Sequence, residues 1–451
     1  MASIGGSEIV ALEVAECFKK NNYAVDIVAN YVGSPVSDIV RDSGINLLTS
    51  DDLPDPFSYD IVWAQHQILP ILVNHYIDSF NNNTYFVFAH LSPYEHLETL
   101  GLYTERLLAD KIFANSKETY NQLCDFGLPT DISDIFFNAS PSEFFHEKAS
   151  NEQPLKNILL VSNHPPEEIL DAMEILKNEY SLNIMNIGVR GQIQRVTPRM
   201  IEYTNAVITI GKTAQYAIVG DTPVYCYDHF GGIGWLSVNN YKKAEEFNYS
   251  GRCCLRKISA REIVEEIIVG YEKAKNDIHE IRHEVLSKYC LDSYISTIIK
   301  ASRENYNSRF INLEDRQKIK SESEITKSIK QYYNAYNELS VYHNGLLIKF
   351  NDLSSKNEQL VSENNIVLDK FNKLTIDHDE LISKFSEVTS TINNLLIHNN
   401  HLLSDNSICL EKYNSLLNSY NKLKNQCLKY KNTFFKKLAR KIKRIYNKNV
   451  N

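Results

Sequence analysis

The sequence predicts an α/β head of two lobes, followed by a long α-helical coiled coil. Three observations support this fold class. Short β-branched and aromatic runs alternate with helical stretches over about the first 300 residues, as in strand–helix–strand units built around parallel sheets. All twelve prolines lie at or before Pro223, and fifteen of the sixteen glycines lie at or before Gly270. A seven-residue apolar repeat begins at Ile325.

Two series of strands are expected, separated near residues 140–156. The first comprises Tyr23–Ala29, Asp60–Ala64, Tyr85–His90 and Lys111–Asn115. The second comprises Asn157–Ser162, Leu182–Gly188, Asn205–Gly211 and Pro223–Tyr227. Each series predicts one Rossmann-like lobe, the first over residues 1–150 and the second over residues 151–310. Ala260–Tyr306 is expected to supply the closing helices of the second lobe.

Residues 311–433 are expected to form a coiled coil. From Ile325 to Tyr430 every seventh residue is apolar, aromatic or cysteine, which defines position d of a heptad. Position a, four residues later, mixes apolar residues with asparagines that would fix the register at a cost in stability; these are Asn357, Asn364, Asn399 and Asn406. As one continuous helix, Ile325–Phe434 would extend roughly 165 Å.

Position e of the same repeat is also often apolar. The residues are Leu347, Val361, Leu368, Ile382, Leu396, Leu403, Leu410 and Leu417. This stripe is wider than a two-stranded seam requires, so the pattern fits three or more strands, or a partner helix. We therefore expect a homo-oligomer formed through the coiled coil. A single amphipathic helix folded back on the head is the alternative.

The C-terminal segment, residues 434–451, is expected to be a basic amphipathic helix. Its apolar residues recur at helical spacing, and basic residues fill the rest of the circumference; the apolar ones are Phe434, Phe435, Leu438, Ile442, Ile445 and Tyr446. No acidic residue follows Glu411. Such a helix can lie in the interface of an anionic membrane. The alternatives are a solvated end of the coil and a nucleic-acid patch, and we favour the membrane.

The composition favours a cytoplasmic protein. The eight cysteines contain no CxxC pair, which argues against a zinc ribbon and against a secreted disulfide framework. The first twenty residues contain three glutamates and no apolar run, unlike a signal peptide. No stretch approaches the roughly 18 apolar residues that a membrane span needs. We expect a location in the cytoplasm, peripheral at most on the inner face of the cytoplasmic membrane.

Gly5-Gly6-Ser7-Glu8 stands directly before a helical pattern. Glycines that enter a helix leave free amide groups at its positive end, suited to a phosphate, although an ordinary helix cap looks the same. Together with the following strand Asn22–Val28, this segment resembles the opening of GT-B-fold glycosyltransferases of the family-four group. His90 ends the strand Phe86–Ala89, where that family often has a histidine. Ala114-Asn115-Ser116 resembles the family's Asn-Ser at a helix start.

The resemblance continues in the second lobe. Thr204–Lys212 followed by Gly220-Asp221-Thr222-Pro223-Val224 is similar to the family's donor-binding strand, helix and Gly-x-Pro-Val turn. Tyr227–Trp235, which includes Gly231 and Gly232, resembles a run found in bacterial surface-polysaccharide transferases. Short motifs spread over about residues 1–300 carry this resemblance.

The sequence departs from the family pattern in two places. The family's first strand precedes the Gly-Gly loop, but only Met1–Ile4 stand there; a misplaced start codon explains this better than a missing central strand. Retaining members also carry two glutamates eight residues apart in the donor lobe. The corresponding positions here are Val207 and Gln215, which puts in doubt the stereochemical outcome and, to a lesser degree, activity.

The resemblance implies a hexosyltransferase that moves a sugar from a nucleotide-sugar donor to a surface-polysaccharide or lipid-linked acceptor. The donor would be a substrate, with no cofactor and no metal. His90 is the candidate catalytic base, and the acceptor side would include Glu95, His96, Asn115 and Ser116. The candidate donor and phosphate ligands are Gly5, Gly6, Arg190, Gly211, Lys212, Thr213, Gln215, Asp228, His229, Gly231 and Gly232.

Each candidate also has a structural interpretation. His90 could be a strand-end histidine satisfied by the backbone, Arg190 and Lys212 could be surface charges, and Gly231–Gly234 could be a flexible loop. A non-catalytic coiled-coil scaffold with a degenerate head is therefore the alternative function. A sugar-nucleotide epimerase, which shares the two-lobed fold, is a third.

Overall fold

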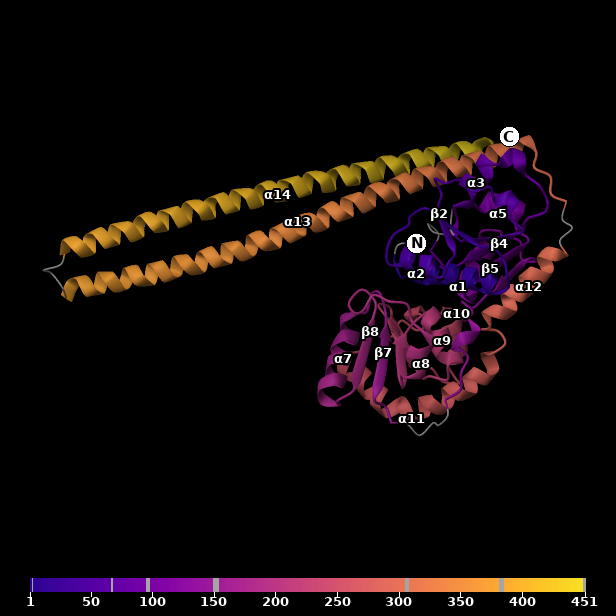
Figure 1. Ribbon diagram of the computed structural model, residues 1–451, viewed down its shortest axis with the longest axis horizontal. Helices are drawn as coiled ribbons and strands as arrows, with labels where there is room; N and C mark the ends of the chain where they lie inside the picture. Colours follow the sequence, from indigo (N-terminus) through magenta and orange to yellow (C-terminus); the bar gives the residue numbers. More distant parts are fainter. Residues whose placement is uncertain are drawn as a thin grey trace. The chain divides into compact units, whose positions relative to one another are not determined.

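The computed structural model describes residues 1, 3–65, 68–94, 98–148, 154–304, 308–380 and 385–448, with side chains left out for 372–390 and from 430 onward. It divides into two units, Met1–Lys327 and Ser328–Asn451. The first unit is an α/β head with two lobes, and the second is a pair of long helices (Figure 1).

The first lobe contains six described strands, all in parallel pairs, in two sheets. The four-stranded sheet has the order β3-β4-β5-β6 and the other sheet pairs β1 with β2. The strands are β1 (Asp26–Ala29), β2 (Asn46–Thr49), β3 (Ile61–Gln65), β4 (Tyr85–His90), β5 (Lys111–Ala114) and β6 (Ser133–Ile135). The helices are α1 (Gly6–Lys20), α2 (Val36–Asp42), α3 (Leu69–His75), α5 (Leu102–Leu108) and α6 (Lys117–Asp125), with 3₁₀ turns Pro56–Ser58, Ile77–Ser79 and Ser142–Phe144.

Strand β4 is the centre of this lobe because both of its faces are covered. Tyr85, Val87 and Ala89 pack into one hydrophobic cluster, and Phe86 and Phe88 pack into another. All six residues of β4 are buried, as expected for a parallel strand between two helical layers.

The first-lobe sheet is divided between β1 and β3. The hydroxyl of Tyr59, just before β3, donates to Oδ2 of Asp26 at the start of β1, at 2.6 Å. Within the described residues, however, β1 pairs only with β2, and β3 pairs only with β4. The strand that the family resemblance implies before Gly5 is not among the described strands. Each of these two strands therefore keeps one edge that no described strand covers.

The second lobe is built on one five-stranded sheet of order β11-β10-β9-β7-β8. The strands are β7 (Asn157–Val161), β8 (Asn183–Ile187), β9 (Ala206–Thr209), β10 (Val224–Asp228) and β11 (Gly231–Trp235). The helices are α7 (Glu167–Glu179), α8 (Pro198–Glu202), α9 (Lys212–Val219), α10 (Tyr241–Glu246) and α11 (Ala260–Val285), with the 3₁₀ turn η4 (Gly251–Cys253). The two-lobed α/β architecture with parallel sheets confirms the predicted fold class.

The predicted glycine-rich turn or loop at Gly231–Gly234 is instead strand β11, antiparallel to β10. Gly231 has φ 103°, and a Cβ on it would lie 2.1 Å from the carbonyl oxygen of Arg256. A Cβ on Gly232 would lie 2.1 Å from the carbonyl oxygen of Cys226. Glycine is needed here because other backbone segments pass close to the strand.

The chain passes between the lobes twice, and the two passages are joined. The amide of Ser140 donates to the carbonyl of Tyr289 at 2.7 Å, and the amide of Leu291 donates to Ser140 at 2.9 Å. After the second passage, α12 (Leu291–Arg303) packs against α1 in a first-lobe cluster, through residues that include Ile295 and Ile298. The predicted second lobe, residues 151–310, is therefore too long, because the apolar face of α12 is buried by the first lobe.

The C-terminal unit is helical, as predicted, but it is not one continuous rod. Helix α13 spans Leu313–Glu380 and helix α14 spans Phe385–Lys448. Ring contacts join His343 to Tyr420 at 5.1 Å and Phe350 to Tyr413 at 5.0 Å between centroids. Because one number rises by seven as the other falls by seven, the helices are antiparallel. They lie side by side (Figure 1).

This pairing shortens the predicted 165 Å rod to a hairpin of roughly 100 Å, at about 1.5 Å per residue over the 68 residues of α13. The start of α13 belongs to the first unit, where Ile311 and Ile319 join the first-lobe core. The tail is helical to Lys448, while its predicted amphipathic faces lie outside the described side chains.

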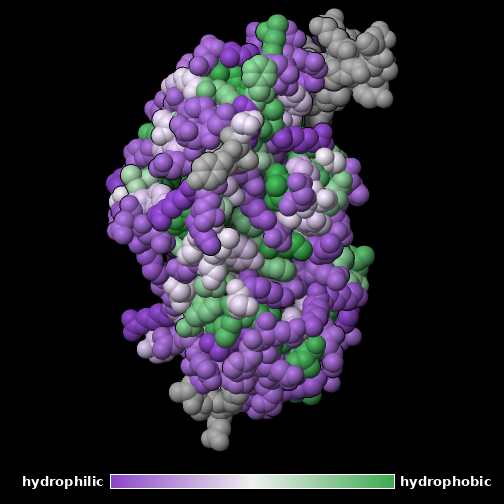
Figure 2. All heavy atoms as spheres, turned by 90° about the vertical axis from the view of Figure 1, so that its right-hand side faces the viewer, coloured by the Kyte–Doolittle hydropathy of each residue, from purple (hydrophilic) through white to green (hydrophobic). Residues whose placement is uncertain are grey.

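No helix in the described part of the chain is both long enough and apolar enough to cross a membrane. On the face shown in Figure 2, hydrophobic side chains form small groups interrupted by hydrophilic ones.

Candidate functional site

The two lobes of the head meet at loops that follow parallel strands. Asn163, after β7, donates from Nδ2 to the carbonyl oxygen of Ile4, directly before α1, at 3.0 Å. Arg252 of η4 pairs with Glu118 in the first turn of α6, directly after β5, with Nη2 and Oε2 2.7 Å apart. The carboxyl ends of strands in both sheets therefore lie on the inter-lobe side.

In the sheet of the second lobe, the order in which successive strands are added reverses between β7 and β9. Strand β8 lies on one side of β7, and β9, β10 and β11 follow on the other. In open α/β sheets, ligands bind beyond the carboxyl ends of the strands at such a switch point. The loops there are Ser162–Pro166 after β7 and Ile210–Gly211 before α9. The candidate site is therefore the inter-lobe edge at these two loops.

A buried ion cluster lies beside this edge. The ammonium of Lys212, in the first turn of α9, lies 2.8 Å from Oε2 of Glu13 on α1. It also donates to the carbonyl oxygens of Asn138 and Ala139, at 3.2 and 2.9 Å. The hydroxyl of Tyr216 donates to the other oxygen of Glu13. Lys212 therefore has three acceptors, as many as an ammonium can use, and is not a surface charge.

Arg195 extends the cluster to a second glutamate of α1. Its guanidinium holds both carboxylate oxygens of Glu16 at 2.7 Å, and Nη2 lies 3.3 Å from Glu13. Burial lowers the pKa of Lys212, while the charge of Glu13 opposes that shift. Burial and the Glu13 charge both raise the pKa of Tyr216, so its hydroxyl stays a donor. The cluster joins the lobes and leaves Lys212 committed to Glu13.

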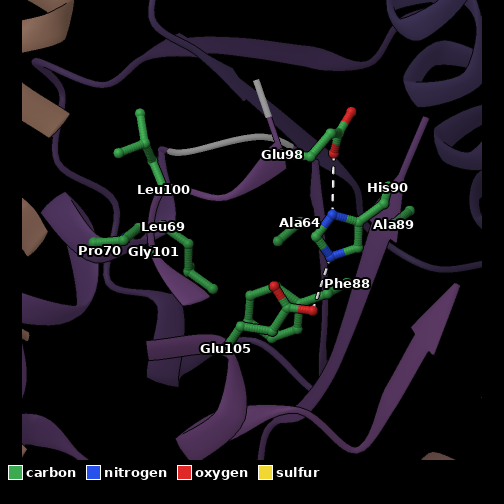
Figure 3. Close-up of a pocket in the computed structure, with 10 residues that line it drawn as sticks. All are labelled: Ala64, Leu69, Pro70, Phe88, Ala89, His90, Glu98, Leu100, Gly101 and Glu105. Atoms are coloured by element: carbon green, nitrogen blue, oxygen red, sulfur yellow. Dashed lines mark hydrogen bonds and ion pairs between the residues drawn. The ribbon is translucent and has the colours of Figure 1, made fainter. Parts of the chain in front are cut away.

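His90, the predicted base, lies elsewhere, inside the first lobe. Figure 3 shows its ring between two glutamates: Nδ1 is 3.0 Å from Oε2 of Glu98 and Nε2 is 2.8 Å from Oε1 of Glu105. Burial lowers the pKa of His90, but the two carboxylates outweigh it and raise the pKa to about 10. The imidazole is therefore doubly protonated at neutral pH.

The surroundings of His90 leave little room for a substrate. The side chain is 93% buried, and the adjoining cavity has about 10 Å³ of free space, roughly enough for one water molecule. With both ring nitrogens donating, His90 has no free site to accept a proton. The structural interpretation of His90 therefore fits this geometry better than the catalytic one.

The predicted acceptor residues that the structure describes also have structural partners. Asn115 donates from Nδ2 to the carbonyl oxygen of Leu91 and accepts from Thr119 Oγ1 at 2.8 Å. Ser116 is the N-cap of α6 and accepts from the Thr119 amide at 3.3 Å. Both residues are buried, so neither is positioned to meet an acceptor. Glu95 and His96 lie outside the described residues.

Several predicted donor ligands are turn residues or buried packing residues. Asp228 accepts from Ser250 Oγ at 2.6 Å and from the amide of Phe230 at 2.8 Å, which closes the turn between β10 and β11. The Gln215 amide donates to Asn248 Oδ1 at 3.3 Å and is buried. His229 is exposed and stacks beside Phe230. With Gly231 and Gly232 inside β11, none of these residues forms a phosphate-binding turn.

The remaining predicted residues lie at loops that follow strands or at helix starts. Gly211 is the N-cap of α9, with φ 60° and ψ −140°. Because glycine has no side chain, no side-chain hydrogen bond caps the start of this helix. Thr213 follows in the first turn and is half-buried. Arg190, after β8, is about half exposed and pairs with Glu167 at 2.5 Å. Such exposed pairs contribute little stability, so Arg190 is free to reorient.

The two glycine-led helix starts differ in charge. Gly5 is the N-cap of α1, and a Cβ on it would lie 2.5 Å from Oε2 of Glu8. That carboxylate already occupies the positive end of α1 and accepts weakly from Ser3 and Ser7, at 3.4 and 3.3 Å. The first turn of α9 contains no acidic residue. Of the two, α9 is the better anion site.

The glutamates that complete these clusters are not among the residues predicted from the sequence. Glu13 is nearly fully buried on the otherwise apolar face of α1. The helical pattern alone could have identified Glu13 as a buried charge that needs a partner. No local signal identifies Glu98, Glu105 or Arg195. Glu98 and Glu105 lie 8 and 15 residues after their partner His90, and Arg195 lies 179 residues from Glu16. Among the described residues, no group of three or more His, Cys, Asp and Glu side chains is placed to hold a metal ion.

No protein-family model matches this chain, and no curated protein matches it. Among solved structures, it is similar to Anabaena Alr3699/HepE, solved in complex with UDP, with UDP-glucose, and with UDP and glucose. Sequence identity is 12%, and the TM-scores are 0.45, 0.45 and 0.46. The matches cover 67% of this chain and 97–98% of the HepE chains.

Proposed function

We propose that the head is a nucleotide-sugar-dependent glycosyltransferase that holds the donor diphosphate at the start of α9. The observation that carries this proposal is the switch point between β7 and β9, which faces the other lobe and has an uncapped, acid-free helix N-terminus beside it. A helix N-terminus offers free amides and a positive dipole end to an anion. The leaving diphosphate develops negative charge, and preformed donors stabilise it.

Each remaining group has a chemical role in this proposal. The amides of Lys212 and Thr213 meet the diphosphate, and Arg190 swings from Glu167 to add a cation. Glu8, at the start of α1, suits sugar hydroxyls rather than phosphate, because a carboxylate accepts hydrogen bonds and repels anions. The acceptor, a surface polysaccharide or a lipid-linked glycan, would approach from the first lobe.

The test is ligand-observed NMR of the full-length protein with a panel of nucleotide sugars, followed by product analysis. We expect saturation transfer to at least one nucleotide sugar and then sugar transfer or slow donor hydrolysis. Conversion of the donor to its epimer would identify an epimerase instead. Absence of binding by every nucleotide sugar tested would overturn the proposal.

A non-catalytic scaffold is the second candidate, and a specific observation favours it. Lys212 and His90, the strongest sequence candidates for donor and proton chemistry, are both fully engaged by glutamates. Neither Val207 nor Gln215 supplies the carboxylate that retaining relatives would have there. Donor binding without turnover in any acceptor mixture would support this candidate over the transferase.

We further propose that the basic tail holds the protein on the inner face of the cytoplasmic membrane, where lipid-linked acceptors reside. The support is the sequence pattern of residues 434–451, continued as helix to Lys448. Flotation of the full-length protein with anionic and with neutral liposomes tests this. Binding should occur only with anionic vesicles and weaken with salt; equal behaviour with both vesicle types would contradict it.

A further inference from the structure

We propose that the α13–α14 hairpin dimerises with a second copy of itself to form a four-helix bundle. The surface involved is an apolar stripe at heptad position e on both helices. Its residues recur at multiples of seven and are 41–49% exposed; they are Leu347, Val361 and Leu368 on α13, and Leu396, Leu403 and Leu417 on α14. Leu410 continues the stripe and is 58% exposed.

The antiparallel pairing places these residues on one face. The His343–Tyr420 and Phe350–Tyr413 contacts set which residues lie level with each other. By that register, Leu347 lies level with Leu417, Val361 with Leu403, and Leu368 with Leu396. In an antiparallel pair, the e positions of the two helices flank the same side of the seam. The stripe is therefore one continuous surface made by both helices.

The opposite flank of the seam is polar. Position g contributes Lys349, Lys356, Glu363 and Lys370 on α13, and His398, Asp405 and Lys412 on α14. The a and d residues between the two flanks are mostly half-buried within the hairpin. A hairpin with an apolar seam, one polar flank and one apolar flank has the pattern of half a four-helix bundle.

The two-helix face that carries the stripe has the size of a stable dimer interface. Leu347–Leu368 spans 22 residues, which is roughly 33 Å of helix at about 1.5 Å per residue. Two helices about 10 Å wide then present roughly 660 Å² per copy, or about 1,300 Å² in total, which lies in the range of specific interfaces. The apolar stripe lies within this face, and an exposed apolar patch rimmed by polar residues marks an interaction site.

The residues that border the stripe favour a second copy over a charged partner. Position b, the next position outward from e, is neutral except at Glu358: it contains Asn344, Asn351 and Asn365 on α13, and Asn393, Asn400, Ser407 and Asn414 on α14. A two-fold axis brings a surface against its own copy, so like charges at its border would repel. With Glu358 as its one charge over this length, the border has little such repulsion and offers little charge to select a different protein.

Buried polar atoms in the hairpin add an independent observation. The Oδ1 atoms of Asn357, Asn364 and Asn399 are buried and have no hydrogen-bond partner. All three are at position a, which borders the e stripe on the helix surface. In a four-helix bundle, position a adjoins the shared core, where asparagines from a second hairpin can pair with them.

Sedimentation of the full-length protein tests the proposal. The wild type should have twice the 51.9 kDa chain mass. Leu368→Glu with Leu403→Glu should give a monomer with unchanged helical circular dichroism, because four carboxylates would enter the interface. The matched control is Ile348→Glu with Ile397→Glu, two exposed apolar residues at position f, which should remain dimeric.

A variant with increased dimer affinity provides a second test, because misfolding could explain a loss of dimerisation but not a gain. Ser354 is the polar interruption of the stripe, level with Leu410. Ser354→Leu should tighten the dimer about tenfold or more, since each copy buries one additional side chain. A monomeric wild type, a dimer insensitive to the e-position glutamates, or an unchanged affinity in Ser354→Leu would each overturn the proposal. A monomer would mean that the head or another protein covers the stripe.

Discussion

The Lys212–Glu13 pair links the lobes through two charges that are both almost completely buried. Removing one partner of such a pair leaves an uncompensated buried charge, at a cost of about 3–5 kcal/mol. Lys212→Met should therefore lower the free energy of unfolding in urea denaturation, by less than that amount because Arg195 and Tyr216 still contact Glu13. Lys212→Met combined with Glu13→Gln should recover much of it. If the single variant is as stable as wild type, the pair is not buried as described.

His90 gives a pH dependence with a definite sign. Its pKa is raised from 6.5 to about 10 in the folded protein, so the charged imidazole stabilises the fold fully below pH 6.5. That contribution is lost as the pH rises through about 10. The stability difference between wild type and His90→Gln, from denaturation midpoints, should be largest near pH 6 and shrink toward pH 10. A difference that grows with pH would contradict the Glu98–His90–Glu105 arrangement.

At the scale of elements, the asparagine layers of the hairpin reduce its stability. Asn364 and Asn399 lie level across the seam, and each has an unpaired buried Oδ1, which costs about 1–3 kcal/mol per atom. In the monomeric Leu368→Glu, Leu403→Glu background, where no second hairpin can pair with these oxygens, Asn364→Leu with Asn399→Leu should raise the thermal midpoint of the helical signal. Asn418→Leu, at exposed position f, is the control and should change it little. Equal midpoints for both variants would show that these oxygens have partners.

The elements also show what a single sequence can predict. Every predicted strand is present within a few residues, because its apolar run is local information. The short β2 and β6, with few buried residues, were not predicted. The sequence could not predict which lobe buries α12, or that the coiled-coil segment reverses after Glu380. A helical period shows that a helix has an apolar face but not what covers that face. The heptad pattern continues through residues 381–384, which include neither proline nor glycine.

In the whole molecule, the contacts between the lobes determine which charged side chains are available to bind a ligand. The sequence ranked His90 and Lys212 highest, and the fold engages both. Their partners, Glu98, Glu105 and Glu13, are buried charges whose pairing depends on tertiary contacts. Arg190, whose only described ion pair is the exposed one with Glu167, and the start of α9 lie outside these buried clusters. The site could therefore be predicted as a region, but not residue by residue.

Arg190 tests the proposed movement of a cation onto the donor. Arg190→Ala should weaken nucleotide-sugar binding about tenfold, or about 1.4 kcal/mol, and leave the unfolding free energy almost unchanged because its Glu167 pair is exposed. Arg261→Ala, which removes a similar exposed pair with Glu179, is the control and should bind normally. Equal affinities for the two variants would exclude Arg190 from the site.

The most direct test of the central claim is the affinity of the full-length protein for a nucleotide sugar, measured by calorimetry, when a charge is placed at the start of α9. Thr213→Asp adds a negative charge that stabilises a helix N-terminus but repels a diphosphate, and Thr213→Asn is its neutral control. We expect Thr213→Asp to bind the nucleotide sugar at least about tenfold more weakly than Thr213→Asn, with both variants folded. Equal binding by the two variants would contradict a diphosphate site at this helix.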